Sequence, residues 1–342
     1  MKIAYIVPSL ANKGPIIVCK DLVTVMVTHG HECIVFYFDN IVELQFTCVT
    51  QKIKFSHSID FSSFDVIHSH GLRPDIYVFM HKPLNCHSLF ISTIHSFIIK
   101  DLSSQYNKYL ASILGRLWIF FLKRHDKILV LSNIALNYYK KWFPLNRLNV
   151  AYNTRILEKE NLTSEEKKEL LDFKKENIIL GVNALLSPIK GIDLIIKSLP
   201  FLENHINLWI VGNGKSMSEL QKLTRKLNLE KRVYFAGYKK DAFRYLPYYD
   251  ISVISSRSEG FGLSLIEAII YKRKIICSDI PIFRELFSDK EITFYELDNI
   301  SSFVKSVELA LNSDKSKSAL NHYKKNYSPQ EFYHKHINIY SR

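Results

Sequence analysis

The sequence predicts an α/β protein made of two doubly wound domains, each a parallel sheet with helices on both faces, that face each other across a cleft. Short apolar runs typical of buried strands alternate with helical segments along the chain. A polar stretch interrupts this alternation once, and a second series of similar length then follows. The 342 residues suffice for two domains of ordinary size.

Strands and helices alternate through the first half of the chain. The first helix begins at Gly14 and Pro15, because proline suits the first turn of a helix, and Gly30 ends it. Lys108 to Arg124 predicts a second, longer helix. Apolar runs typical of buried strands occupy residues 2–9, 31–38, 65–68, 89–95 and 127–132.

A composition break at residues 158–177 separates the two halves. Nearly all of these residues are charged or polar, which favours a solvated helix at a domain boundary. We expect one domain over 1–160, a second over 176–325, and a last helix within 326–342 that could cross back to the first domain. The second domain should hold strands at 178–185, 206–212, 232–237, 251–256 and 274–279 and helices at 191–202, 216–229 and 262–272.

Composition narrows the class of protein. Hydrophobic residues make up 47% and charged residues 23%, which is normal for a globular core and excludes disorder, collagen and a small disulfide scaffold. The 5 cysteines are scattered without any C-x-x-C, which favours a reducing compartment and no cysteine-based zinc site. No apolar run approaches the roughly 20 residues of a membrane span. A cytoplasmic protein is expected, with peripheral attachment to the inner face of the cell membrane as an option.

The chain is basic, with 46 Lys and Arg against 33 Asp and Glu, a net charge of +13. Nucleic acid, an anionic membrane surface and a phosphorylated substrate are the three partners that such a charge suits. No RNA-binding motif, zinc finger or long basic block is present, so nucleic acid is not expected. The helix around residues 113–124 combines Arg116, Lys123 and Arg124 with Trp118, Phe120 and Phe121. It reads either as a packed helix or as an amphipathic membrane-surface helix.

The most informative stretch lies between a predicted strand and a predicted helix at residues 258–268. Gly260 and Gly262 allow close backbone approach, and the helix N-terminus offers N–H groups to an anion. Glu259 and Glu267 can accept hydrogen bonds from sugar hydroxyls. The alternative is an ordinary strand–turn–helix with two surface glutamates.

Two further loops carry similar signals. Lys190 stands just before a helix, where its ammonium could neutralise a diphosphate, although most lysines in loops are simply solvated. The stretch from Gly212 to Ser216 follows a strand and is similar to part of a P-loop motif. That motif would need glycine at the position of Trp209, so only a glycine-rich turn remains.

These three loops, in this order, resemble the retaining glycosyltransferases of family GT4, which have the GT-B fold of two Rossmann-like domains; the resemblance covers nearly the whole chain. It implies that Glu259 contacts the donor sugar and Glu267 the nucleotide ribose. It implies that Lys190 binds the diphosphate. It assigns the first domain to the acceptor and the second to the nucleotide sugar. The remaining donor-binding positions that it implies are Gly14, Gly212, Tyr238, Gly260, Phe261, Gly262 and Leu263.

The first domain matches the family less closely. His68 and His70 resemble the family's strand ending in His-x-His, and could be strand-end polar residues or a metal pair. His95 resembles the histidine near the family's reaction centre, and the resemblance gives it a catalytic role with Glu259 and Lys190. The family often has arginine where this chain has Leu185.

A glycine commonly precedes Gly14 in the family, and Lys13 takes its place here.

The resemblance implies a metal-independent retaining transferase without a cofactor. It moves a hexose-type sugar from a nucleotide-diphosphate sugar, a UDP-sugar being favoured over a GDP-sugar, to a glycan or lipid-linked acceptor. The chain holds no D-x-D sequence, which argues against the GT-A fold. The alternative is a catalytically weak relative that acts as a partner subunit or sugar-binding module. An epimerase on the same fold fits the loop at Glu259 less well.

Overall fold

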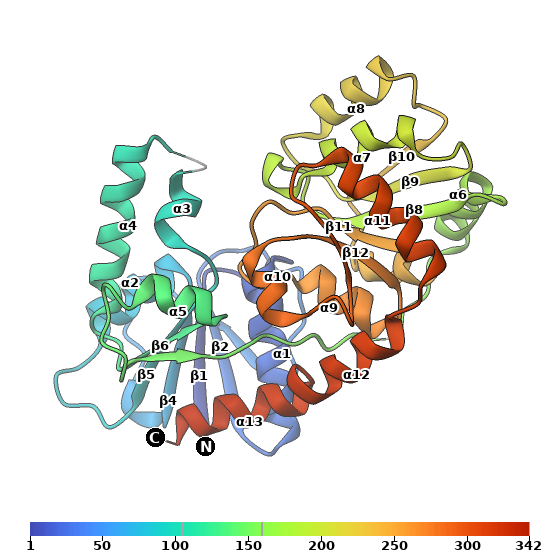
Figure 1. Ribbon diagram of the computed structural model, residues 1–342. Coiled ribbons are helices and arrows are strands. Elements are labelled where there is room, and N and C mark those ends of the chain that lie inside the picture. Colours follow the sequence, from blue (N-terminus) through green and yellow to red (C-terminus); the bar gives the residue numbers. More distant parts are fainter. Residues whose placement is uncertain (104–105, 159, 342) are drawn as a thin grey trace. The chain divides into compact units, whose positions relative to one another are not determined.

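The computed structural model describes residues 1–103, 106–158 and 160–341 and divides into two compact units (Figure 1). Unit 1 comprises Met1–Ile156 with Tyr327–Arg342, and unit 2 comprises Leu157–Asn326. Each unit holds one wholly parallel sheet with helices packed against it. The prediction of a doubly wound α/β fold is confirmed.

Unit 1 has a seven-stranded sheet in the order β3-β2-β1-β4-β5-β6-β7. The chain winds outward from β1 in one direction and then from β4 in the other, so the order reverses between β1 and β4. The strands are β1 (Lys2–Val7), β2 (Glu32–Tyr37), β3 (Val49–Lys52), β4 (Val66–His70), β5 (Leu89–Ile94), β6 (Lys127–Val130) and β7 (Leu148–Val150). The α-helices are α1 (Gly14–Thr28), α2 (Leu72–His81), α3 (Ile98–Ser103), α4 (Lys108–Leu122), α5 (Asn133–Tyr139) and α13 (Pro329–Tyr340).

The last helix, α13, packs against α1 of unit 1, as Figure 1 shows. It begins at a serine cap, where Ser328 accepts a hydrogen bond from the Glu331 backbone N–H. Its Tyr340 is buried and lies with Tyr5 of β1 and His68 of β4. The C-terminal helix therefore completes the covering of this sheet.

Unit 2 has a six-stranded sheet in the order β10-β9-β8-β11-β12-β13, with its reversal between β8 and β11. The strands are β8 (Ile178–Asn183), β9 (Ile206–Val211), β10 (Val233–Gly237), β11 (Ile251–Ile254), β12 (Lys274–Ser278) and β13 (Thr293–Tyr295). The α-helices are α6 (Ser164–Lys174), α7 (Ile192–Ser198), α8 (Met217–Lys226), α9 (Leu263–Ile270), α10 (Pro281–Leu286), α11 (Ile300–Asn312) and α12 (Ser316–Asn326). The short 3₁₀ helices of the two units are η1 (Phe61–Ser63), η2 (Pro188–Lys190), η3 (Leu199–Phe201) and η4 (Ala242–Tyr248).

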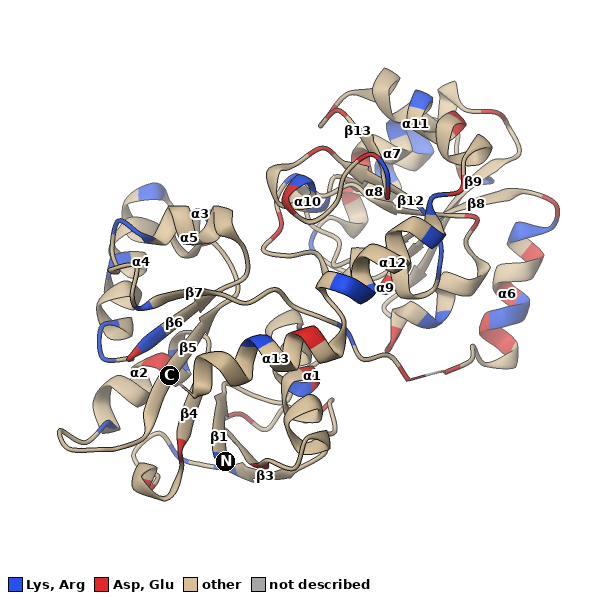
Figure 2. Ribbon diagram, turned by 60° about the horizontal axis from the view of Figure 1, so that its bottom comes forward, with Lys and Arg blue, Asp and Glu red and all other residues tan. Residues whose placement is uncertain are grey.

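The polar stretch between the two predicted series forms α6, the first helix of unit 2. Thr163 and Glu166 close a capping box at its start, and Leu170 is its one buried residue. Figure 2 shows acidic and basic positions mixed along α6. This helix is solvated, as its composition predicts.

No helix in the described ranges is long and apolar enough to cross a lipid bilayer.

Candidate functional site

In unit 2 the loops that follow β8 and β11 leave the sheet at the point where the strand order reverses. Carboxyl ends of parallel strands share one edge of a sheet, so these two loops lie side by side there. The loop after β8 carries Lys190, and the loop after β11 carries Glu259. The structure therefore brings together two predicted site residues that are 69 positions apart in sequence.

The two loops touch so closely that one position must be glycine. Gly191 has φ of +63°, and a Cβ there would lie 2.1 Å from the carbonyl oxygen of Ser255. The Ser255 hydroxyl donates to the Lys190 carbonyl oxygen at 2.6 Å, and the Arg257 backbone N–H donates to that of Ile189 at 2.7 Å. These contacts fix the backbone on both sides of the Lys190 side chain.

Lys190 and Glu259 form a partly buried ion pair. The Lys190 Nζ lies 2.5 Å from Glu259 Oε1, and the Ser256 hydroxyl donates to the same oxygen at 2.7 Å. The lysine side chain is 24% exposed and the glutamate 13%. An ammonium and a carboxylate thus stand together, and both side chains are partly accessible from solvent.

The loop then turns into α9 through Gly262. This residue has φ of +96°, and a Cβ would meet the Phe283 ring at 2.6 Å, so any larger residue would strain the turn. Phe261 is buried and holds the loop down. Helix α9 begins at Leu263 and presents its N-terminus at this edge of the sheet, where helix N–H groups favour an anion. Glu267 lies on the second turn and is partly exposed.

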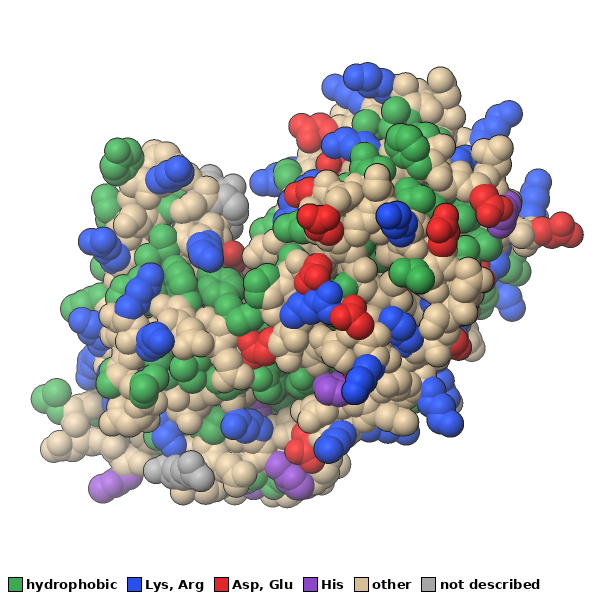
Figure 3. All heavy atoms as spheres, viewed as in Figure 1, with side chains coloured by type: hydrophobic (Ala, Val, Ile, Leu, Met, Phe, Trp, Pro, Cys, Tyr) green, Lys and Arg blue, Asp and Glu red, His purple; other side chains and the backbone are tan. Residues whose placement is uncertain are grey.

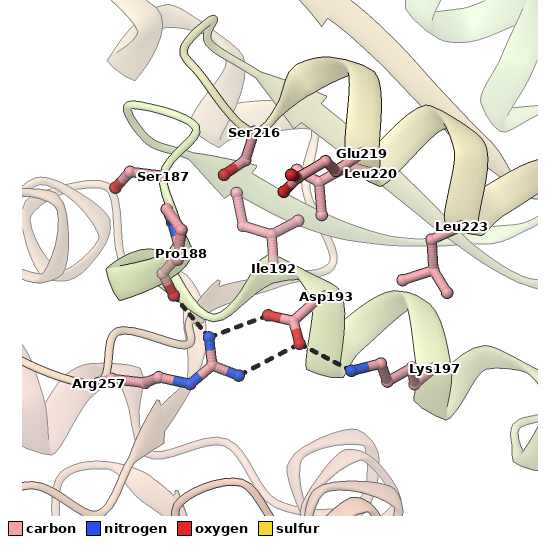
Figure 4. A pocket seen from close by; sticks show the side chains of 10 residues that line it. All are labelled: Ser187, Pro188, Ile192, Asp193, Lys197, Ser216, Glu219, Leu220, Leu223 and Arg257. Atoms are coloured by element: carbon pink, nitrogen blue, oxygen red, sulfur yellow. Dashed lines mark hydrogen bonds and ion pairs between the residues drawn. The ribbon is translucent and has the colours of Figure 1, made fainter.

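Arg257 ties the two loops to their surroundings. Its guanidinium donates to both oxygens of Asp193, at 3.0 and 3.2 Å, and to the Pro188 carbonyl oxygen at 2.5 Å (Figure 4). It also reaches Asp298 at 2.7 Å. Hydrogen bonds to Asp298 and Asp193 raise the pKa of Arg257 above its usual value.

Arg257 also lines a pocket of about 370 Å³ between α7 and α8. Since its donors are engaged within the protein, it acts as an anchor of the loops. Arg257 was not among the predicted site residues. The position of this arginine between a strand and the glycine loop is the local feature that could have indicated its role.

The loops after β9 and β10 complete this edge of the sheet. Gly212 has φ of +143°, and a Cβ there would lie 1.9 Å from the Ala184 carbonyl oxygen. Its N–H donates to the Gly237 carbonyl oxygen at 2.8 Å, which joins the two loops. Tyr238 follows β10 and is 59% exposed. Leu185, where the family often has arginine, is 68% exposed and brings no charge to this edge.

The predicted histidines of unit 1 lie toward the carboxyl ends of β4 and β5. His70 ends β4 and His95 follows β5, with 2.9 Å between His70 Nδ1 and His95 Nε2. His68 is fully buried, and its ring nitrogens lie 2.7 Å from the hydroxyls of Tyr340 and Thr93. His68 therefore joins the sheet to α13 as a structural residue.

Two further predictions for unit 1 concern the position of Gly14 and a metal site at the histidines. Gly14 is the first residue of α1, with Lys13 as the N-cap. Within the described ranges no group of three or more His, Cys, Asp or Glu side chains could hold a metal ion.

Comparisons with known proteins agree on one class of enzyme. The family model described as glycosyl transferases group 1 matches residues 163–327. The chain is 34% identical over 319 residues to the O-antigen biosynthesis glycosyltransferase WclY of Escherichia coli, covering 91% of this chain and 89% of that protein. It is 31% identical over 147 residues to an N-acetylgalactosaminyltransferase of Campylobacter jejuni that acts on a diphospho-undecaprenol-linked sugar, covering 42% of this chain and 40% of that protein.

Solved structures show the same fold. Anabaena HepE in complex with UDP-glucose superposes with a TM-score of 0.83 at 14% identity, covering 100% of this chain and 99% of HepE. The lipopolysaccharide outer core galactosyltransferase WaaB superposes with a TM-score of 0.72 at 16% identity, covering 100% and 99%.

Fold and site together define a glycosyltransferase of the GT-B class. The chain belongs to the glycosyl transferases group 1 family.

Proposed function

We propose that this protein is a retaining glycosyltransferase of family GT4 that builds a bacterial surface polysaccharide such as O-antigen. It moves a hexose-type sugar from a nucleotide-diphosphate sugar to a hydroxyl of a glycan or lipid-linked acceptor. The ion pair of Lys190 and Glu259 beside the start of α9 carries this proposal. The name of the Escherichia coli relative supports the pathway, and the UDP-glucose bound to HepE supports a UDP-sugar as donor.

The donor binds at the carboxyl edge of the unit 2 sheet. Lys190 and the backbone N–H groups from Phe261 to Leu263 hold the diphosphate, because cations and helix N-termini favour phosphate. Glu259 accepts hydrogen bonds from hydroxyls of the donor sugar, and Glu267 from those of the ribose. Gly212, Tyr238, Gly260 and Gly262 shape the remaining donor site in unit 2, and Gly14 is a further donor-binding residue in this proposal.

Donor binding exchanges the partner of Lys190. In the structure this ammonium pairs with Glu259, whose carboxylate also accepts from Ser256. The diphosphate brings more negative charge than one carboxylate and attracts the ammonium. Glu259 is then released toward the sugar hydroxyls, so the same pair serves both ends of the donor.

Reaction consists of breaking the bond between the anomeric carbon and the diphosphate oxygen while the acceptor oxygen bonds that carbon from the same face. Configuration is therefore retained. The proton of the acceptor hydroxyl passes to the departing diphosphate oxygen on that face. Negative charge develops on the leaving nucleoside diphosphate, where Lys190 and the α9 amides stabilise it. These groups supply the positive charge that a metal supplies in other designs. His95 is the remaining residue to which we assign a catalytic role.

A second candidate is a catalytically weak relative that serves as a partner subunit or sugar-binding module. The exposed, uncharged Leu185 favours it, because a common part of the family's diphosphate clamp is missing. A donor-hydrolysis assay separates the two: the enzyme releases nucleoside diphosphate and sugar from its donor, and the module binds the donor without releasing either.

Glu267→Ala should weaken binding of the free nucleotide by about 1–3 kcal/mol, because the ribose hydroxyls lose an acceptor. Titration calorimetry with UDP measures this, after a thermal-shift panel of UDP- and GDP-sugars has identified the best donor. Glu308→Ala, on the exposed face of α11 in the same unit, is the matched control and should bind UDP like the parent. Unchanged UDP affinity in Glu267→Ala would remove this residue from the site.

A lipid-linked acceptor lies in a membrane, and helix α4 of unit 1 has a surface that suits contact with one. This helix has no acidic residue (Figure 2), and its outer face exposes basic and apolar side chains together (Figure 3). We name this face the α4 surface; it consists of Lys108, Tyr109, Leu110, Ile113, Arg116, Leu117, Phe120 and, just after the helix, Lys123. Such a face suits the headgroup region of an anionic membrane.

Two aromatic residues of this helix face inward. Trp118 donates to the buried Asp75 carboxylate at 2.7 Å, and the Phe121 ring lies 5.1 Å from that of Phe79. The expectation that the whole aromatic cluster could meet a membrane is corrected for these two, since their contacts hold α4 on the unit. Leu117 and Phe120 remain exposed.

Replacing Leu117 and Phe120 with glutamine should weaken co-sedimentation with vesicles containing anionic lipid and leave the fold intact, because both side chains are about half exposed. Binding of the parent protein should fade as salt rises, because the charge attraction is screened. Trp118→Gln is the contrast variant and should unfold or aggregate. Equal binding of the parent protein to neutral and anionic vesicles would contradict the charge attraction.

A further inference from the structure

We propose that His70 is a positioning residue that holds His95 in one tautomer, with its proton on Nδ1, so that His95 offers an N–H donor to an oxygen of the sugar substrates. This inference rests on the proposed function for the presence of those sugars. It assigns to the second histidine of the His-x-His sequence a role that differs from the structural role of His68.

The pair is set by the register of two neighbouring strands. His70 pairs with Thr93 across β4 and β5, which places the end of β4 beside the residues that follow β5. His70 Nδ1 and His95 Nε2 are 2.9 Å apart, and the ring centroids 5.2 Å. His70 is 1% exposed, whereas His95 is partly exposed. The ring of His70 thus lies inside the unit and contacts that of His95, which is only partly accessible from solvent.

Both rings are neutral at pH 7. Burial lowers the pKa of His70 well below its usual value and that of His95 to about 3. A neutral imidazole carries one N–H, so a single proton lies between the two facing nitrogens. Either His70 donates from Nδ1 or His95 donates from Nε2.

The environment of His70 Nε2, the ring nitrogen that does not face His95, indicates which of these two arrangements is present. His70 Nε2 is buried and has no hydrogen-bond partner among the residues that the structure describes. If His95 were the donor, the proton of His70 would sit on that nitrogen as a buried N–H without an acceptor. Orphaned buried N–H groups are rarer than under-satisfied acceptors in proteins. His70 therefore donates from Nδ1, and its buried Nε2 keeps a lone pair.

The ring of His70 is held in place from one side by His68. Their rings stack with centroids 4.4 Å apart, and His68 is itself fixed by Tyr340 and Thr93. Tyr5 lies on the neighbouring strand with its ring centroid 6.4 Å from that of His70. Rotation of His70 would break this packing, so its donor keeps its direction.

The consequence for His95 follows from its accepting Nε2. Its own proton must sit on Nδ1, and no residue in the described part of the chain accepts a hydrogen bond from that nitrogen. A ring with a protonated Nδ1 donates to a hydroxyl, ring or phosphate oxygen of a sugar substrate. It cannot take the acceptor's proton at that atom, so His95 acts as a hydrogen-bond donor rather than as the general base.

The test reads the tautomer directly. Long-range ¹H–¹⁵N spectra of the full chain labelled at histidine distinguish Nδ1–H from Nε2–H, and His95→Gln identifies the His95 signals by their loss. The parent protein should show His95 as Nδ1–H. His70→Leu removes the donor, so His95 should shift toward the Nε2–H form that free imidazole side chains prefer. His70→Asn can place an amide N–H near the lost Nδ1–H and should restore much of the parent tautomer.

His125→Asn is the matched control, because this histidine of unit 1 is as buried as His70 but contacts Ser69 and Asp75 rather than the rings of His70 and His95. It should lower thermal stability and leave the His95 tautomer unchanged. An Nε2–H form of His95 in the parent protein, or an Nδ1–H form retained in His70→Leu, would overturn the proposal.

Activity gives a second readout that separates the inference from the proposed function. If the protein transfers sugar, His70→Leu should lower kcat by roughly ten-fold or more with a smaller change in KM for the donor, and His70→Asn should recover part of it. If no donor is turned over, the proposed function fails while the tautomer result still stands. Full turnover in His70→Leu despite a changed tautomer would overturn the role of this donor.

Discussion

Acidification from pH 6.5 to about 4.5 is expected to unfold unit 1 while unit 2 stays folded. Unit 1 buries histidines as neutral groups, and burial is the largest cause that lowers each pKa, to about 3 for His95 and His125 and to about 4 for His336. Two others, His68 and His70, lie well below the usual value for the same reason. All five belong to one compact unit.

The direction of this pH effect on stability follows from the protons that each state binds. In the unfolded chain these histidines bind protons below a pKa of about 6.5, and in the folded unit they do not until the pH is far lower. The unfolded state therefore binds more protons over this range, so stability is lost as pH falls.

Two buried carboxyls act in the opposite direction. Burial raises the pKa of Asp21 to about 6 and that of Asp75 to about 7, so each retains its proton in the fold where the unfolded chain releases it. Their contribution is largest at low pH and is lost as pH rises. Five histidines bind a proton on unfolding and two carboxyls release one, so unfolding takes up about three protons. The free energy of unfolding therefore falls by roughly 4 kcal/mol for each pH unit of acidification. Two pH units then remove about 8 kcal/mol, which unfolds a domain whose stability lies in the lower half of the usual range of about 5–15 kcal/mol.

Hydrogen–deuterium exchange at several pH values measures each unit separately. Unit 2 is the internal control, because its two histidines, His205 and His322, lie at or near the surface. His336→Phe should reduce the acid sensitivity of unit 1 by about one proton, since the ring already packs against Phe332. Simultaneous loss of protection in both units as pH falls would contradict the histidine account.

The meeting of the Lys190 and Glu259 loops, where we propose that the donor binds, was partly predictable because its signals are local. A buried strand, two glycines and a helix start stand within one short stretch around Glu259, and Lys190 precedes a helix in the same way. That the two stretches meet follows from the reversal of strand order, which is a rule of doubly wound sheets. Their pairing with each other carries no local signal, because the two residues are far apart in sequence.

Edge strands and packing directions were not predictable. Strand β3 (Val49–Lys52) is exposed along its whole length, so it lacks the alternation that marks a half-buried strand. Strands β7 and β13 have three residues each, too few for a pattern. The sequence also could not show that Trp118 faces inward, because its partner Asp75 lies on another helix. The contact of His70 with His95 depends on strand register in the same way.

Lys190→Ala should lower turnover by about a hundred- to a thousand-fold, because the charge that builds on the leaving diphosphate loses its nearest cation. Lys190→Arg should lose less, since the charge remains although the planar guanidinium differs in shape from an ammonium. Steady-state kinetics with the donor identified by thermal shift give both values. Lys197→Ala on α7 is the matched control, because this exposed lysine pairs with Asp193 and should turn over like the parent.

A double variant, Lys190→Ala with Glu259→Gln, should distinguish the effect of Lys190 on stability from its effect on turnover. Lys190→Ala leaves the Glu259 carboxylate, 13% exposed, without its cation, which destabilises the loop. Adding Glu259→Gln removes that unpaired charge, so the melting temperature should recover while turnover stays low, because neither the diphosphate cation nor the sugar-binding carboxylate is present. If turnover instead recovered together with stability, or if Lys190→Ala turned over like the parent, Lys190 would be only the structural partner of Glu259. The proposed exchange of Lys190 from the carboxylate to the diphosphate requires that stability recovers in this variant while turnover does not.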